Sequence, residues 1–158
     1  MDSREPGGKP QLTEFLAGYG GPPAIEYRGG RVKVIAAIVY RDGVVIEWLV
    51  GPVPDLSLIS DIEQSSDEQS SSFFPQLRDQ PARLESLRRF KRLAAFWSSA
   101  TLTDDLGSHY QRAWGDAGSA EGLGYRGREA FSPRPPEGAR ELTVHVHDLA
   151  ITIALIRA

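Results

Sequence analysis

Apolar and polar residues alternate in a pattern that predicts a long β-hairpin in the first third of the chain. The stretch RVKVIAAIVYRDGVVIEWLV has β-branched residues on both sides of the Asp42-Gly43 pair. That pair suits a type I′ turn, in which both central residues have positive φ. We therefore predict strands at 32–40 and 44–50. The first strand is apolar on both faces, which indicates a central strand that is covered on both sides.

A second pattern, with helical spacing, follows later in the chain. Apolar residues recur every three or four positions: Leu84, Leu87, Phe90, Ala94 and Trp97. Such a stripe is typical of an amphipathic helix, and Pro81 suits a first helical turn. The spacing predicts a helix over 81–93 that docks by its leucine and phenylalanine side. Three basic residues of this segment are expected to face outward: Arg88, Arg89 and Arg92.

The helix follows a segment of contrasting composition. Residues 55–72 are acidic and rich in serine, whereas 78–92 are basic. We interpret 55–92 as an insertion that consists of an acidic loop and one basic amphipathic helix. The polar, glycine- and proline-containing residues 1–11 indicate a flexible tail. The remaining residues, 12–158, are expected to form one domain.

Short stretches with strand character make up the rest of the chain. We predict strands in AAFWSSATLT, HYQRAWG, YRGREAFSP, RELTVHV and LAITIALI, separated by turns at DDLG, GDAGSAEGLG, PRPPEG and HD. Strands this short with turns this frequent predict an antiparallel β-sandwich. Trp48 is a candidate core residue, as are Leu142, Val144 and Val146. The glycine-rich stretch EFLAGYGGPP predicts no stable helix.

Two aspartates in the turn LTDDLGSHY raise the question of a binding site. Asp104 and Asp105 precede Gly107, and Tyr110 lies three residues beyond the glycine. Aspartate side chains bond to nearby backbone in turns, and glycine supplies positive φ, so a turn needs no ligand. We expect Tyr110 to pack over this turn. Calcium binding by Asp104, Asp105 and Asp116 is a weaker alternative, because no EF-hand spacing is present.

These stretches carry a resemblance to a known group of domains. LTDDLGSHY, then FSPRPPEGARELTV, then a terminal apolar strand, resembles a set of uncharacterised immunoglobulin-like β-sandwich domains in bacteria. The hairpin with YRDGVVIEW is similar to the N-terminal half of those domains. The resemblance omits the insertion. It implies an all-β, immunoglobulin-like antiparallel β-sandwich with one helical insertion, and it implies no catalytic residues.

Composition narrows the possible classes of function. There is no cysteine, which excludes a disulfide framework, a thiolate metal site and a cysteine nucleophile. The net charge of −3 is too mild to imply a polyanionic partner for the whole surface. The N-terminus lacks the pattern of a signal peptide, and the apolar stretches are shorter than the ~20 residues that span a bilayer. We therefore expect a soluble, cytoplasmic protein without a cofactor.

A histidine pair is the strongest candidate for metal chemistry. His145 and His147 are two residues apart on a predicted strand, which can present two imidazoles to one metal ion. His109, Asp148 or an aspartate of the LTDDLG turn would supply a third ligand. The alternative follows from strand alternation: Leu142, Val144 and Val146 fill the core, and the histidines face solvent.

Two further motifs have structural interpretations. Gly122, Gly124 and Gly127 match G-x-G-x-x-G, but a dinucleotide site needs a helix next, and prolines follow instead. We interpret these glycines as a flexible loop. The PRPP stretch at 133–136 formally fits a polyproline ligand, but a crossing between strands explains it better.

The sequence as a whole predicts a non-catalytic binding or assembly module. The expected partner is another protein or a second copy of the chain. Its contacts would come from the helix: Leu84, Leu87, Phe90, Arg88, Arg89 and Arg92. One alternative is a metal-dependent enzyme that uses His145 and His147. The other is a polyanion-binding accessory protein that uses the 83–92 helix to bind nucleic acid or an anionic membrane.

Overall fold

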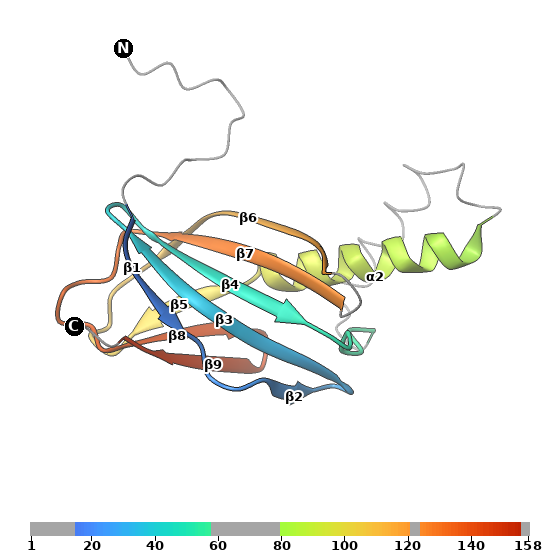
Figure 1. Ribbon diagram of the computed structural model, residues 1–158, viewed down its shortest axis with the longest axis horizontal. Coiled ribbons are helices and arrows are strands. Elements are labelled where there is room, and N and C mark those ends of the chain that lie inside the picture. Colours follow the sequence, from blue (N-terminus) through green and yellow to red (C-terminus); the bar gives the residue numbers. More distant parts are fainter. Residues whose placement is uncertain (1–14, 58–79, 121–123, 156–158) are drawn as a thin grey trace, which may run out of the picture.

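A computed structural model describes residues 15–57, 80–120 and 124–155, and it contains two antiparallel sheets and a helix (Figure 1). The larger sheet has the strand order β1-β3-β4-β7-β6, with β2 also paired to β3, and the smaller sheet has the order β5-β8-β9. The elements are β1 (Phe15–Gly20), β2 (Ile25–Tyr27), β3 (Gly30–Tyr40), β4 (Val44–Val50), α2 (Pro81–Ser98), β5 (Thr101–Asp104), β6 (Gln111–Ala120), β7 (Gly124–Ser132), β8 (Glu141–Val146) and β9 (Leu149–Ala154). The predicted all-β sandwich with one helical insertion is confirmed.

The β3–β4 hairpin is confirmed, but its turn differs from the prediction. Tyr40 N donates to Gly43 O at 2.8 Å, so Arg41 and Asp42 form the tip. Neither Asp42 nor Gly43 has the positive φ that a type I′ turn needs, so that part of the prediction is wrong. The register of the core-facing residues, with a bulge between Val34 and Ala36, determines where the turn falls.

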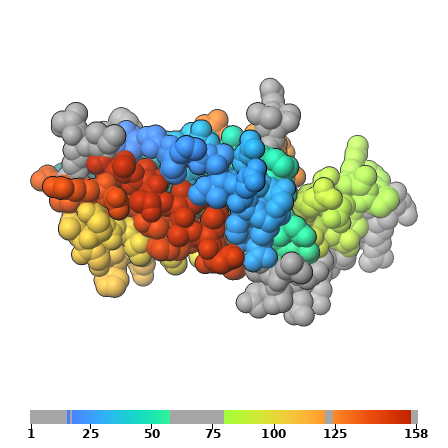
Figure 2. All heavy atoms as spheres, turned by 90° about the horizontal axis from the view of Figure 1, so that it is seen from below, coloured from blue at the N-terminus to red at the C-terminus, as the bar shows by residue number. Residues whose placement is uncertain are grey.

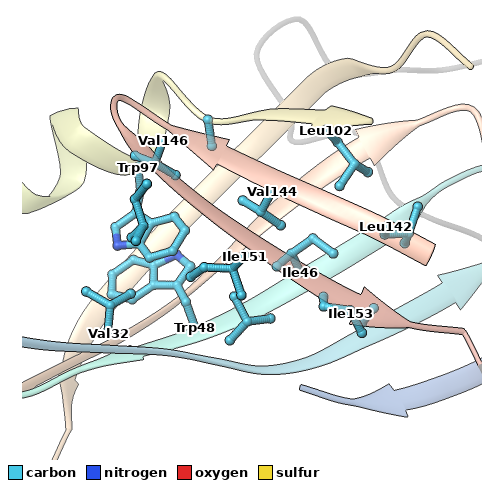
Figure 3. Packing of buried hydrophobic residues seen from close by; sticks show 14 of the residues in the cluster. Val32, Ile46, Trp48, Trp97, Leu102, Leu142, Val144, Val146, Ile151 and Ile153 are labelled. Atoms are coloured by element: carbon cyan, nitrogen blue, oxygen red, sulfur yellow. The ribbon is translucent and has the colours of Figure 1, made fainter. Parts of the chain in front are cut away.

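The core lies between the two sheets (Figure 3). Trp48 is fully buried, and its ring stacks on Trp97 with the centroids 4.8 Å apart and the planes 5° apart. The three predicted core residues of β8 are also buried: Leu142, Val144 and Val146. The opposite face of β3 is only half-buried at Lys33 and Ile38. The prediction that this central strand is covered on both sides therefore holds only in part, since the outer face is covered at Val45 and Ala130 beside it but not fully at Lys33 and Ile38.

The helix α2 is longer than predicted and completes the smaller layer of the sandwich. It continues to Ser98, so the strand predicted over 94–103 is wrong for its first half, and β5 begins only at Thr101. The reason is burial: Leu93, Phe96 and Trp97 share one helical face and fill the space at the end of the sheets. The N-terminal half of α2 projects beyond that end (Figures 1 and 2).

Two segments that are rich in small residues form strands, one where only the absence of a stable helix was predicted and one where a turn was predicted. The stretch EFLAGYGGPP supplies β1, which pairs with β3. The turn predicted at GDAGSAEGLG is wrong for its first half, because β6 continues to Ala120 along β7. Glycine at 115 leaves room there, since a Cβ would overlap the ends of the Arg112 and Glu129 side chains, which would have to shift.

A buried carboxylate, that of Glu129, lies beside Gly115. Glu129 points to the inner face of β7 and is 3% exposed. Arg112 Nε donates to its Oε2 at 2.7 Å, and the Arg112 side chain is 30% exposed. Burial raises the pKa of Glu129 to about 7, against the attraction of Arg112, which lowers it.

Candidate functional site

The candidate site starts at the turn between β2 and β3. Tyr27 pairs with Gly30, so Arg28 and Gly29 are the two central residues. Their φ values are 46° and 77°, as a type I′ turn requires. An arginine in this left-handed region costs about 1 kcal/mol, because its Cβ lies too close to the backbone. The type I′ turn expected in the next hairpin occurs here.

The segment 51–57 lies against this turn. Its backbone is joined to the hairpin by three hydrogen bonds: Arg31 N to Pro52 O, Gly51 N to Arg31 O, and Asp55 N to Arg28 O. The close approach depends on Gly30, where a Cβ would overlap the backbone of Pro54. The hairpin and the segment 51–57 therefore form one wall, and a side chain at position 30 would separate them.

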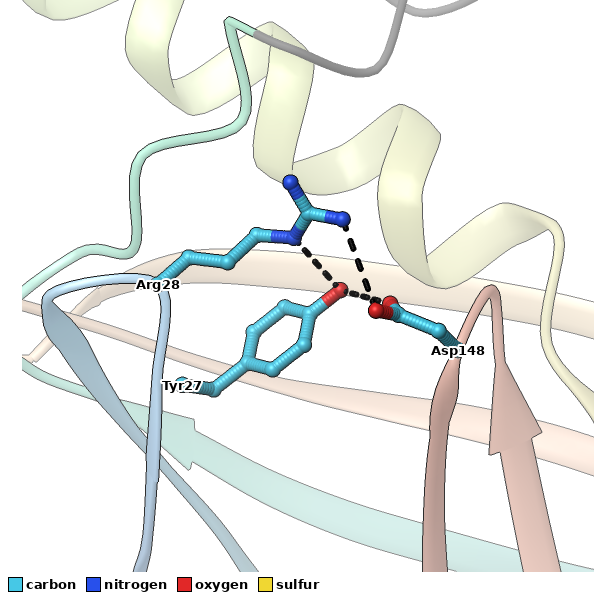
Figure 4. A network of polar contacts seen from close by, with 3 residues as sticks. All are labelled: Tyr27, Arg28 and Asp148. Atoms are coloured by element: carbon cyan, nitrogen blue, oxygen red, sulfur yellow. Dashed lines mark hydrogen bonds and ion pairs between the residues drawn. The ribbon is translucent and has the colours of Figure 1, made fainter.

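Arg28 is held in place by a polar network (Figure 4). Its Nε donates to Tyr27 Oη at 3.0 Å, and its Nη2 lies 3.5 Å from Asp148 Oδ2. The Tyr27 hydroxyl also donates to Asp148 Oδ1. This hydrogen bond from Tyr27 is the main cause that lowers the pKa of Asp148, while burial chiefly raises that of Tyr27. The network connects the β2–β3 turn to the β8–β9 turn.

The opposite wall is the projecting half of α2. Glu85, Arg89 and Arg92 follow at helical spacing and line the same hollow. Arg89 Nε lies 3.4 Å from Glu85 Oε1, in an ion pair whose side chains are 64% and 44% exposed. Such an exposed pair contributes less than about 1 kcal/mol, so it can exchange partners easily.

These two walls enclose a cleft of about 480 Å³, which we call the arginine cleft. It is lined by Arg28, Gly29, Val53, Pro54, Asp55, Leu56, Ser57, Glu85, Arg89 and Arg92. Three guanidinium groups and two carboxylates thus line the cleft, together with the apolar residues Val53, Pro54 and Leu56. Ser57 holds the Asp55 carboxylate through its N–H and its hydroxyl, which lowers the pKa of Asp55; Arg28 and Arg92 contribute further to that lowering.

The helix residues predicted to bind a partner separate into two groups. Leu84, Leu87 and Phe90 are half-buried, and the Phe90 ring lies 5.4 Å from that of Tyr125 on β7. Of the arginines, only Arg89 is exposed as predicted. The prediction that Arg88 and Arg92 face outward is wrong, because both are half-buried.

The histidines are not brought together as a metal site. His145 points away from the core, and its Nε2 lies 2.9 Å from Thr103 Oγ1. His147 belongs to the β8–β9 turn, where its φ is 53° and its ring stacks on Phe96. Its Nε2 is 3.3 Å from Ser99 Oγ, but the neighbouring Asp148 bonds to Tyr27. This arrangement is not a Ser-His-Asp triad. His109 lies in an exposed loop.

The LTDDLG turn has the structural role expected of it. Asp104 accepts hydrogen bonds from Leu106 N and Ser108 N, each at 2.9 Å, and from the Tyr110 hydroxyl at 2.8 Å. Asp105 accepts from the backbone N–H groups of residues 140 and 141. Gly107 has the positive φ that the turn requires. Both carboxylates are therefore occupied by the fold.

The remaining sequence motifs are explained by the fold. Asp116, the third residue of the calcium hypothesis, pairs with Arg128 at 2.8 Å. Within residues 15–57, 80–120 and 124–155, no group of three or more potential ligands is placed to hold a metal. Gly124 and Gly127 lie in strand β7, so the loop interpretation is wrong for them, and Gly122 lies outside the described residues. The PRPP stretch connects β7 to β8, as expected of a crossing.

Of the residues that line the arginine cleft, the sequence pointed only to Arg89 and Arg92. Tyr27, Arg28, Asp55 and Asp148 are far apart in the chain, and the contacts of the network and the cleft depend on how the sheets pack. One local signal was available. The Gly29-Gly30 pair after a short β-branched and aromatic stretch is typical of a two-residue hairpin turn.

Comparison with known proteins adds no family. No protein-family model matches the sequence, and neither a curated protein nor a solved structure matches it. In the described part of the chain, no helix combines the length and the apolar character needed to cross a membrane.

Proposed function

We propose that this chain is a non-catalytic binding or assembly module, and that its partner-binding surface is the arginine cleft with the projecting half of α2. The observation that carries the proposal is that the two halves of α2 have different surroundings, one buried in the core and the other lining a cleft. Leu93, Phe96 and Trp97 anchor its C-terminal half in the core, while Glu85 and Arg89 stand in the wall of a cleft. A rigid element that presents an open polar surface suits recognition of a partner.

The expected partner is another protein. The cleft combines apolar lining residues with charged ones, which matches the mixed character of protein–protein contacts. Arginine is also enriched at the energetic centres of such interfaces. Leu84 and Leu87 are half-buried on other faces of the same projecting half of α2.

The two alternative functions have less support. A metal-dependent enzyme would need His145 and His147 to converge, but their nearest polar partners are Thr103 and Ser99 respectively. A polyanion-binding protein would need a continuous basic face on α2. Arg88 and Arg92 are half-buried, and the cleft also contains Asp55 and Glu85, which oppose a long polyanion.

We infer an immunoglobulin-like domain of bacterial type over 12–158, because its two antiparallel sheets are built from hairpins within each sheet and are connected by crossings between them. The Asp104 turn, closed by Tyr110, is consistent with the turn chemistry of that resemblance. A cytoplasmic location is proposed on the sequence pattern alone.

The binding surface is tested by site-directed photo-crosslinking in extract of the source cells. A photoreactive residue replaces Arg89, or, as a matched control, Arg126 on β7. Both arginines are exposed and each forms a loose ion pair, with Glu85 and Glu47 respectively. We expect a protein that crosslinks from position 89 and not from 126. That protein is then purified and titrated by calorimetry.

The calorimetric titration decides the outcome. Arg89→Glu should weaken binding of the purified partner by roughly tenfold or more, and Arg126→Glu should leave it within about twofold. If the crosslinked species is a second copy of the chain, sedimentation should show an association that Arg89→Glu abolishes. Equal crosslinking from both positions, or equal affinity of both variants, would show that the cleft is not the binding surface.

A further inference from the structure

We propose that the arginine cleft binds an oxyanion, a carboxylate or a phosphate, on an acidic peptide segment of the partner, and that Arg28 is its anchoring residue. This inference rests on the proposed function and names the chemistry of the same site. It is carried by the geometry of Arg28, by the exchangeable ion pair on α2, and by the lining of the cleft.

The backbone of Arg28 has an unusual left-handed conformation. Arginine is unfavourable at φ 46°, and asparagine, aspartate or glycine would suit the position better. Strain of this kind persists where the surrounding structure fixes it, and it occurs often at binding sites. Here the conformation places a long cationic side chain between the two sheets and α2, where none of the preferred turn residues would reach.

The orientation of its guanidinium is the second argument. Nε donates to Tyr27 Oη at 3.0 Å, and Nη2 makes a longer contact of 3.5 Å with the exposed carboxylate of Asp148, so the two partners restrict the orientation of the group. Figure 4 shows the third nitrogen pointing away from Asp148, toward α2. This third nitrogen, Nη1 of Arg28, makes no hydrogen bond to any of the residues that the structure describes. A guanidinium restricted in this way has lost part of its rotamer freedom before binding, which reduces the entropy lost on capturing an oxyanion.

The facing wall supplies the second charge. Arg89 reaches the same cleft from α2, and its contact with Glu85 is long and exposed. An oxyanion between Arg28 and Arg89 would replace that weak pair by charge-assisted hydrogen bonds, which are stronger than hydrogen bonds between neutral groups. The Ser57 N–H and hydroxyl both bond to Oδ1 of Asp55, so this oxygen is already engaged within the segment 51–57.

The lining selects a peptide as the carrier. Val53, Pro54 and Leu56 form an apolar surface beside the guanidinium groups, which suits an acidic residue next to an apolar one. A nucleic acid offers a phosphate at every step, and these would meet Asp55 and Glu85 as well as the overall charge of −3. A short acidic-apolar segment presents its charge at one place only.

The test uses the full chain and three fluorescent hexapeptides that differ at one position. The first contains glutamate beside leucine, the second phosphoserine beside leucine, and the third glutamine beside leucine. Binding is measured by fluorescence anisotropy, with inorganic phosphate as competitor. We expect the glutamate or the phosphoserine peptide, or both, to bind at least about tenfold more tightly than the glutamine peptide. Which of them binds identifies the carboxylate or the phosphate as the source.

Variants locate the binding. Arg28→Gln and Arg28→Lys should each weaken the tighter peptide by roughly tenfold, since lysine keeps the charge but loses the planar fork. Arg89→Gln should weaken it as well and does not depend on the strained turn. The control Arg126→Gln, from an exposed pair outside the cleft, should change affinity by less than about twofold. Thermal unfolding checks that each variant is folded.

Several results would overturn the inference. These are equal binding of all three peptides, unchanged affinity in both Arg28 variants, or an oligonucleotide that binds more tightly than the peptides in an Arg28-dependent way. Crosslinking from position 89 tests the binding surface independently of the peptide titrations. A partner captured at Arg89 whose affinity is unchanged in Arg28→Gln would leave the binding function standing and refute the oxyanion contact.

Discussion

Replacing Glu129 by glutamine is expected to stabilise the protein at neutral and alkaline pH. The glutamate lies on the inner face of β7, 3% exposed, with Arg112 Nε 2.7 Å from its Oε2. Glutamine has nearly the same volume and can accept the same hydrogen bond through its amide oxygen. The substitution therefore removes the ionisation of this side chain while leaving the packing in place.

The magnitude follows from the pKa. Burial raises the pKa of Glu129 from 4.5 to about 7 in the folded protein. Between these values the folded state binds more protons than the unfolded state, so the free energy of unfolding falls as pH rises. A rise of about 2.5 in pKa corresponds to about 3 kcal/mol at roughly 1.4 kcal/mol per pKa unit. This loss develops between pH 4.5 and pH 7 and is constant above that range.

Glu129→Gln should therefore equal the wild type near pH 4.5 and exceed it by up to about 3 kcal/mol above pH 7. Local relaxation and water entry reduce the gain, because a buried ion pair is seldom as costly as its burial alone implies. Urea unfolding followed by tryptophan fluorescence, at intervals from pH 4.5 to 8.5, measures the difference. Glu141→Gln is the matched control, because Glu141 lies exposed on β8.

The test is how the difference in unfolding free energy between the wild type and Glu129→Gln changes with pH. Other groups also titrate in this range, but they cancel when wild type and variant are compared at each pH. A variant that is less stable than the wild type by the same amount at pH 5 and pH 8 would refute the reasoning. It would mean that the charged contact with Arg112 outweighs the cost of burying the carboxylate.

Further outcomes are expected elsewhere. Trp97→Ala removes the ring stacked on Trp48 and should cost about 3 to 5 kcal/mol in urea unfolding. Asp104→Ala leaves two backbone N–H groups and a tyrosine hydroxyl without their acceptor, and should lower stability by about 2 kcal/mol. Leu87→Asp, at a half-buried position on α2, should weaken partner binding while a calorimetric scan still shows a cooperative transition. Elemental analysis should find no stoichiometric zinc; about one zinc per chain, lost on replacing His145 and His147 by alanine, would contradict this.

Local sequence patterns predicted those strands and helices in which core-facing apolar residues recur at the spacing of a strand or a helix. The β3–β4 hairpin follows from its β-branched residues, and Pro81 marks the start of α2. The end of α2 was not predictable from local pattern, because the aromatic residues near 96 suit a strand as well as a helix. Only the space between the sheets, which Trp97 fills, decides between them.

Glycine-rich segments and the candidate site depended on contacts that are distant in the chain. β1 forms because β3 offers it a partner, although its own sequence favours neither strand nor helix. The Asp42-Gly43 pair suits a type I′ turn, yet strand register places that turn type at Arg28-Gly29 instead. The arginine cleft joins residues 28, 55 and 89, and no spacing in the sequence relates them.

The pairing of β4 with β7 has a consequence for the order of folding. The hairpins β3–β4, β6–β7 and β8–β9 each join strands that follow one another in the chain, so each can form early with little loss of chain entropy. The junctions between them are non-local, such as Val44 with Phe131 or the stacked pair Trp48 and Trp97. Because late, non-local contacts limit the rate of folding, assembly of preformed hairpins is expected to be the slow step. Substitutions at these junctions should then slow folding, whereas those in the hairpin turns should chiefly change how readily each hairpin forms.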